Sequence, residues 1–219
     1  MRWKRTASLV LLAFSLLLRL SAQQAGAAVG WHNGEWQFGI RGPGNWYADA
    51  NSFLRVYDEL QVPEGGWTVV GAFSDNGFPE PRTIVNASWE IRRGMAPGNG
   101  GEIVASGVTP AIQGPDPSVT AKKYPAAEIP LHFRIQVDNL RVQLPPGHYW
   151  FSVTPVSDNK VHVSATLGAN AVGLDRTGLG MTLIDRPEGP RFAILESTTS
   201  RPGQLGMAQH CAQGVIIAK

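Results

Sequence analysis

The sequence has little charge, a single cysteine and no glycine repeat, and each scarcity excludes a class of protein. Only 16% of the 219 residues are charged while 43% are hydrophobic, which excludes a disordered acidic or basic tail. One cysteine cannot pair within its own chain, so a disulfide scaffold is excluded. The glycines show no period of three, which excludes collagen. The length suffices for one sizeable domain or two small ones.

The N-terminal segment has the composition of an export signal. A basic segment (2–5) precedes an apolar run (7–18), and a small-residue cleavage site of the A-x-A type follows at 25–27. A transmembrane anchor or a buried helix is the alternative, but the run is too short to span a bilayer comfortably. We therefore predict a cleaved signal peptide at 1–27, with an earlier cut after Ala22 as a second option.

Cleavage changes the charge of the working molecule. The removed segment carries four of the 19 basic residues and no acidic one, so 15 basic residues remain beside 17 acidic residues. With this balance and no basic run, we expect no nucleic-acid partner. The only cysteine, Cys211, is far from the cleavage site, so no lipid anchor is indicated, and no remaining apolar stretch is long enough for a membrane span. The expected location is secreted, periplasmic or extracellular.

Apolar and polar residues alternate along the mature chain with a period of two, as in strands with one buried face. The clearest example is 131–137, and a shift of phase at 138–139 predicts a bulge. A turn at 145–147 leads to a second alternating segment, 149–154, so the two segments predict an antiparallel hairpin. No mature segment carries the apolar stripe of a helix. We predict an all-β fold, an antiparallel β-sandwich of the jelly-roll kind, as a single domain over 28–219.

Turn-forming residues separate these segments. Ser-Asp-Asn-Gly at 74–77 predicts a turn, and the Pro- and Gly-rich stretch 93–130 predicts long surface loops around one or two short strands. The pairs Asp75–Asn76 and Asp158–Asn159 have the oxygens that calcium prefers, although both are also ordinary turn residues. Calcium is therefore a minor option, and no other cofactor is expected.

A family resemblance rests on a succession of short motifs. They are Val-Tyr-Asp-Glu-Leu at 56–60, Gly-Gly-Trp-Thr-Val at 65–69, Ala-Ser-Trp-Glu-Ile-Arg at 87–92, Gly-Asn-Gly-Gly at 98–101 and Pro-Gly-His-Tyr-Trp-Phe-Ser-Val at 146–153. In these the chain resembles a group of uncharacterised exported bacterial β-sandwich proteins, some of which carry sorting tails of the PEP-CTERM or choice-of-anchor kind. The resemblance covers about residues 30–175 and implies an exported β-sandwich without assigned catalytic residues. The chain differs from the anchored members in showing no C-terminal sorting helix.

Motifs for catalysis or metal binding are missing from the sequence. It contains no G-x-S-x-G, no H-E-x-x-H, no phosphate-binding loop and no EF-hand loop. His132 and His162 occupy polar positions of their strands, where we expect solvent-facing side chains. His210 and Cys211 are adjacent, but two ligands are too few for structural zinc, and a free thiol is expected at Cys211. We predict a non-enzymatic protein with no catalytic and no metal-binding residues.

Paired carboxylates are the one arrangement that keeps an enzyme as an alternative, because glycoside hydrolysis needs two of them across a sugar. The candidates are Asp58, Glu59, Glu90, Glu102 and Asp138. Asp58 and Glu59 are neighbours on a strand and point to opposite faces, so they form no such pair. We expect these carboxylates to be solvated, and a hydrolase is the least favoured alternative.

Aromatic residues are the more informative feature. Alternation places Trp67 and Trp89 in the core, while Trp150 shares a face with polar neighbours. Trp46 and Tyr47 lie in an Asn- and Gly-rich stretch near the N-terminus of the mature chain, which also includes Trp31 and Trp36. Aromatic rings on an exposed surface are what a polysaccharide-binding protein needs, although burial of the rings is an equally physical outcome. We predict Trp150, Trp46 and Tyr47 as ligand-binding residues.

Two functions from different classes follow from these features. The leading prediction is an exported, non-enzymatic domain that binds a glycan or another cell-surface ligand. The alternative is a structural or assembly component of the cell envelope or extracellular matrix, which uses exposed sheet edges for contacts with envelope proteins. The positions of the tryptophan rings decide how well the first prediction is supported.

Overall fold

The computed structural model describes residues 26–34, 41–117, 131–158, 161–166, 171–173, 182–195 and 210–219. The predicted signal peptide up to residue 25, Trp36 and Asn159 lie outside the described residues. No helix in the described part is long and apolar enough to cross a membrane.

Fourteen strands make up the described fold. In chain order they are β1 (Ala27–His32), β2 (Arg41–Gly44), β3 (Trp46–Asp49), β4 (Ser52–Val62), β5 (Trp67–Phe78), β6 (Asn86–Arg93), β7 (Glu102–Pro115), β8 (Leu131–Leu144), β9 (Gly147–Pro155), β10 (His162–Thr166), β11 (Thr182–Asp185), β12 (Ala193–Ile194), β13 (His210–Cys211) and β14 (Gln213–Ala218). Because β1 begins at Ala27, a cut after Ala27 would remove its first residue, whereas a cut after residue 22 leaves it whole.

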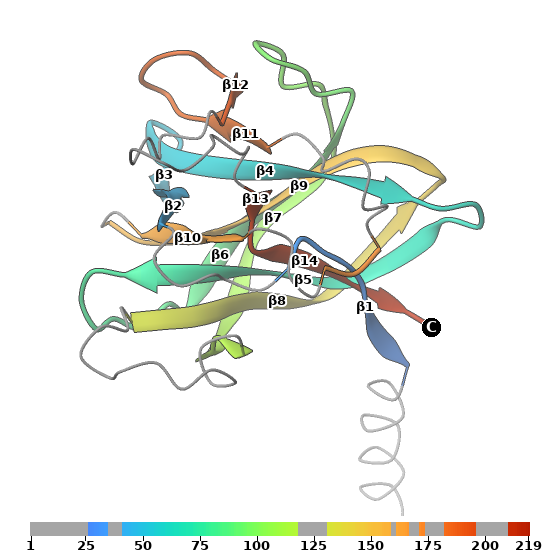
Figure 1. The fold of residues 1–219 in the computed structure, drawn as a ribbon, viewed down its shortest axis with the longest axis horizontal. Coiled ribbons are helices and arrows are strands. Elements are labelled where there is room, and N and C mark those ends of the chain that lie inside the picture. The colour runs from blue at the N-terminus through green and yellow to red at the C-terminus, as the bar shows by residue number, and fades with distance from the viewer. Residues whose placement is uncertain are drawn as a thin grey trace, which may run out of the picture.

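The strands form one antiparallel sheet that curls into a half-barrel (Figure 1). The main path runs β1-β14-β5-β8-β7-β6-β9-β4-β11-β12, with β2, β3, β10 and β13 attached beside it. In Figure 1, β4 and β9 lie on one side of the molecule and β5 and β8 on the other. The prediction of an antiparallel all-β fold is confirmed. Its finer part, a jelly-roll sandwich, stays a prediction, because the two sides belong to one continuous curled sheet.

The long strand β7 joins the two sides. Its first part, from Glu102 to Pro110, pairs with β6, and its second part, from Ala111 to Pro115, pairs with β8. The prediction of loops around short strands over 93–130 is therefore wrong for 107–115, where β7 continues as one long strand. The prediction failed because the two glycines and two prolines of this segment are typical of turns, whereas here they lie within a strand that changes its partner from β6 to β8 at Pro110.

The hydrophobic core lies between the two sides of the curled sheet. It takes Leu60 and Val62 from β4, Trp89 from β6, and Ile135 and Val137 from β8, all buried. The alternation predicted at 131–137 and the burial predicted for Trp89 are thus confirmed. The predicted bulge is also confirmed, because the pairing of β8 with β5 shifts register after residue 138 and Asn139 has a positive φ of 60°.

The connection from β8 to β9 is not the predicted hairpin. β8 pairs with β5 and β7, whereas β9 pairs with β4 and β6, so the turn at Pro145–Pro146 carries the chain across the core. The connection from β4 to β5 makes the same crossing at Pro63–Gly66. The hairpin prediction failed because alternation fixes which residues face the core and not which strand is the hydrogen-bonded neighbour.

The predicted turn at 74–77 is also wrong, because these residues lie inside β5. Each polar side chain there has a buried partner instead of water. Arg134 donates two hydrogen bonds to Asp75, at 2.7 and 2.8 Å, and Asn45 donates to Asn76 at 3.1 Å. Satisfied hydrogen bonds make polar residues acceptable in a buried strand. With Asp75 bound to Arg134, the oxygens suggested for calcium at Asp75–Asn76 are already used by the fold.

Candidate functional site

The three predicted ligand-binding residues do not form one exposed row. Trp150 is buried, with 8% of its surface exposed, and packs with Tyr57, Leu183 and Phe192 on the outer face of the sheet. Tyr47 is half-buried on β3. Trp46 is half-buried as well, but it packs against the core between the two sides of the sheet. The expectation of an exposed platform at Trp150 is therefore wrong, because side chains from β4 and β11 and from the segment around Phe192 cover the ring.

Beside Trp150 lies a cluster of paired charges that we call the ionic face, made of Arg55, Tyr57, Ser88, Glu90 and Arg92. It lies on β4 and β6, which flank β9. Glu90 accepts hydrogen bonds from Arg55, from the Tyr57 hydroxyl at 2.7 Å and from Arg92 Nε at 2.6 Å. Arg55 also donates to Ser88 Oγ at 2.9 Å. The prediction that Glu90 is solvated is wrong, since its side chain is only 8% exposed.

The electrostatics of the ionic face favour a fixed, structural arrangement. Burial raises the pKa of Tyr57 well above its ordinary value, and the negative charge of Glu90 raises it further. Tyr57 therefore stays protonated and donates to Glu90 at every physiological pH. The Arg55 guanidinium also lies 4.8 Å from the centre of the Tyr47 ring, a cation–π distance. Both Glu90 oxygens are engaged, so Glu90 has no unused oxygen to act on a substrate.

The other candidate carboxylates are also engaged with neighbours. Glu59 lies 3.2 Å from His148, Asp138 accepts from Gln136 at 2.8 Å, and Glu102 pairs with Arg93 at 2.7 Å. In the part of the chain that the structure describes, no group of three His, Cys, Asp or Glu residues could hold a metal ion.

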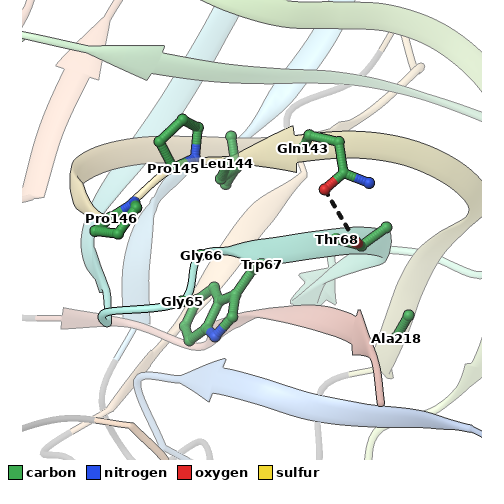
Figure 2. A pocket seen from close by; sticks show the side chains of 9 residues that line it. All are labelled: Gly65, Gly66, Trp67, Thr68, Gln143, Leu144, Pro145, Pro146 and Ala218. Carbon is green, nitrogen blue, oxygen red and sulfur yellow. Dashed lines mark hydrogen bonds between the residues drawn. The ribbon is translucent and has the colours of Figure 1, made fainter.

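An open hollow lies where the two crossing turns meet, at the β4–β5 and β8–β9 connections (Figure 2). Its volume is about 370 Å³. We call it the Trp67 hollow; it is lined by Gly65, Gly66, Trp67, Thr68, Gln143, Leu144, Pro145, Pro146 and Ala218. None of these nine described residues is titratable, so the lining of the hollow is neutral.

Trp67 supplies the aromatic surface of this hollow. Its side chain is partly buried and packs against the core, as its predicted core-facing position implies, and it also lines the hollow. Figure 2 shows the indole extending from β5 on the side away from the Pro145–Pro146 turn. Next to it, the Thr68 hydroxyl donates a hydrogen bond of 3.1 Å to Gln143 Oε1 on β8. The hollow therefore combines an indole ring with a hydroxyl and a side-chain amide.

Turn chemistry holds the two walls of the hollow close together. Gly65 and Gly66 have φ values of +100° and +70°, which other residues rarely adopt. A Cβ atom on Gly66 would lie 2.7 Å from the carbonyl oxygen of Leu144 on the opposite wall. Sequence reasoning missed this site because alternation assigned Trp67 to the core. The sequence feature that could have indicated it is the Gly65–Gly66 pair directly before Trp67, which predicts a turn at the surface.

A separate set of titratable groups is buried on other parts of the sheet. Asp58 accepts hydrogen bonds from Thr182 at 2.6 Å and from Gln213 at 2.9 Å, and burial raises its pKa to about 7. Burial lowers the pKa of His32 and of His132 to about 4. The prediction that His132 faces solvent is wrong, because its ring is buried and its Nδ1 atom lies 3.0 Å from Ser164 Oγ.

The only cysteine behaves as a buried residue. Cys211 is a free thiol with no exposed surface, as predicted for a residue without an internal partner. Burial raises the pKa of its thiol, and the nearby Asp58 carboxylate raises it further. A protonated and inaccessible thiol is a poor nucleophile, so Cys211 contributes packing rather than chemistry.

No family model, no curated protein and no solved structure matches this chain. The resemblance to exported bacterial β-sandwich proteins therefore stays a prediction.

Proposed function

We propose that this chain is an exported, non-enzymatic β domain that binds a neutral glycan in the Trp67 hollow. The observation that carries the proposal is the partly buried Trp67 indole that lines an open hollow beside Thr68 and Gln143. The C–H face of a sugar packs on an indole ring, while hydroxyl and amide groups exchange hydrogen bonds with sugar hydroxyls. The export part of the proposal is supported by the N-terminal sequence features.

Two further features support a binding role. The neutral lining offers no charge for a carboxylate or sulfate on the ligand, which favours neutral sugars over acidic ones. The two walls of the hollow are also packed closely at Gly66, where a Cβ atom would lie 2.7 Å from the Leu144 carbonyl oxygen. A preformed site loses less free energy on ordering when it binds. The engaged oxygens of Glu90 favour binding over carboxylate-dependent hydrolysis.

The test is a titration of the purified domain with neutral oligosaccharides and with a uronate oligosaccharide, followed by tryptophan fluorescence and calorimetry. We expect binding of at least one neutral sugar, and Trp67→Ala should weaken it about tenfold or more, the size of effect found for buried aromatic contacts. Trp150→Phe is the matched control, because it alters a buried ring outside the hollow. Binding that Trp67→Ala leaves unchanged, or no binding of any glycan by folded protein, would contradict the proposal.

A further inference from the structure

The pairing between β7 and β8 stops at a proline. It runs from Pro115 with Phe133 to Ala111 with Val137, so the next pair would join Pro110 and Asp138. The N–H of Ala111 donates to the carbonyl of Val85, on the β6 side of β7. Because neighbouring residues in an antiparallel strand direct their backbone groups to opposite sides, Pro110 is directed toward β8. Proline has no N–H to donate, so the ladder ends there.

Beyond Pro110 the two strands separate. β8 departs from its regular path at Asn139, whose φ is 60°. From there it stays paired with β5 but is no longer paired with β7. A groove of about 520 Å³ lies at the separation, with Thr109–Ile112 on one wall, Asp138–Arg141 on the other and Trp89 between them. The first part of β7 is therefore paired with β6 on one side only.

The same alternation identifies the backbone groups on the open side. Since Ala111 is directed toward β6, so are the alternate residues Thr109 and Gly107, and the N–H and C=O groups of Val108 and Ser106 point away from β6. Among the residues that the structure describes, no strand pairs with β7 on that side before Ala111. Unpaired groups at strand spacing are complementary to another extended backbone.

The open edge lacks the usual protection against pairing. Residues 103–115 contain no charged residue, although edge strands are commonly protected by charges. Three apolar side chains of the strand are also strongly exposed: Ile103 at 48%, Val108 at 56% and Ile112 at 58%. The nearest charge within the strand, Glu102, is already paired with Arg93. The edge is thus apolar, neutral and long enough to hold an added strand.

We propose that the open edge of β7 pairs with the same edge of a second copy of this chain, in antiparallel orientation about a two-fold axis at Gly107. In this arrangement Ser106 of each copy exchanges hydrogen bonds with Val108 of the other. A second copy fits this edge because the outward-pointing residues Ser106 and Val108 lie symmetrically about Gly107, and because a neutral strand meets no like-charge repulsion when it faces itself. Association through one strand edge is expected to be weak and to depend on protein concentration.

Sedimentation velocity over a wide range of protein concentration tests this pairing. Wild type should shift from monomer to dimer as concentration rises. Val108→Lys places a charge on the edge and should keep the protein monomeric throughout the range. Ser106→Pro should do the same, because it removes an N–H that points away from β6 and so spares the pairing with β6.

Val29→Lys is the matched control, since Val29 is an exposed valine on β1, the edge strand at one end of the main path. It should dimerise like wild type, and circular dichroism should show all variants folded. A monomer at every concentration would overturn the proposal and leave the edge to a different protein partner. Dimerisation that Val108→Lys and Ser106→Pro do not change, or that Val29→Lys abolishes, would also overturn it.

Discussion

The ionic face and the Trp67 hollow each place polar side chains beside a tryptophan, but those side chains are charged on the ionic face and neutral in the hollow. Both combine a tryptophan with polar side chains on neighbouring strands. On the ionic face the polar groups bind one another, Glu90 taking three donors, and Trp150 is covered. In the hollow the partly buried indole of Trp67 lines an open volume, and the Thr68 hydroxyl donates to Gln143. The comparison indicates that a tryptophan in the sequence is a useful candidate for ligand binding only where distant segments do not cover its ring, as they do at Trp150.

The largest predicted effect is the loss of unfolding free energy when Glu90 is removed from the ionic face. Glu90→Ala leaves Arg55 and Arg92 without their shared carboxylate, and both arginine side chains are nearly buried. Removing one partner of a buried ion pair costs about 3–5 kcal/mol of the free energy of unfolding. Urea denaturation measures this loss, and glycan affinity of the folded variant should stay unchanged.

Glu102→Ala is the control for that prediction, because Glu102 also pairs with an arginine but on the exposed surface. Removal of an exposed pair costs about 0–1 kcal/mol. Equal losses in the two variants would show that burial is not what distinguishes the ionic face.

The second prediction uses pH to separate the stability of the fold from ligand binding in the hollow. Asp58 has a folded-state pKa near 7, above its unfolded value, so it stabilises the fold at low pH and loses this contribution as pH rises toward 7. The lowered pKa values of His32 and His132 act in the opposite direction, adding stability as pH rises from about 4 to 6.5.

Asp58→Asn should therefore remove the loss of stability between about pH 4 and 7, so that stability rises more steeply with pH over this range than in wild type. Urea midpoints at several pH values from 4 to 8 measure the difference. Glycan binding by folded protein should not follow this change, because no lining residue of the hollow titrates. Parallel pH profiles for the variant and wild type would refute the role given to Asp58.

Alternation predicted which strand residues face the core, as at Ile135, Val137 and Trp89, because side chains of a strand point to alternate faces. It failed at Glu90, His132 and Trp150. These residues lie on the polar faces of their strands, but other segments far away in sequence cover those faces. A period of two reports the face of the strand and contains no information on what packs against it.

The same limit explains why the hollow was not predicted. Trp67 lies at the end of its strand, where a core-facing position opens to the surface between two turns. Those turns became neighbours because β4 pairs with β9 and β5 pairs with β8. Pairing between distant strands depends on the whole set of strands, so residues 65–68 and 143–146 could not be connected from their local sequence.

The smallest predicted effect tests whether the Thr68 hydroxyl takes part in glycan binding in the hollow. Thr68→Val removes the hydroxyl beside Trp67 and should weaken glycan binding between about twofold and tenfold, since one hydrogen bond contributes about 0.5–1.5 kcal/mol. Thr68→Ser keeps the hydroxyl and should bind nearly as wild type. Calorimetry measures both, and unfolding stability should hardly change because this bond is exposed. Equal affinity of Thr68→Val and wild type would remove Thr68 from the site.

The central claim is that the open hollow, and not the covered ionic face, receives the ligand. Indole N–H resonances of ¹⁵N-labelled protein, followed while a neutral oligosaccharide is added, test it most directly. The account predicts a progressive shift of the Trp67 resonance while that of Trp150 stays in place. A shift of Trp150 without Trp67, or no shift of Trp67 with any sugar that the protein binds, would contradict it.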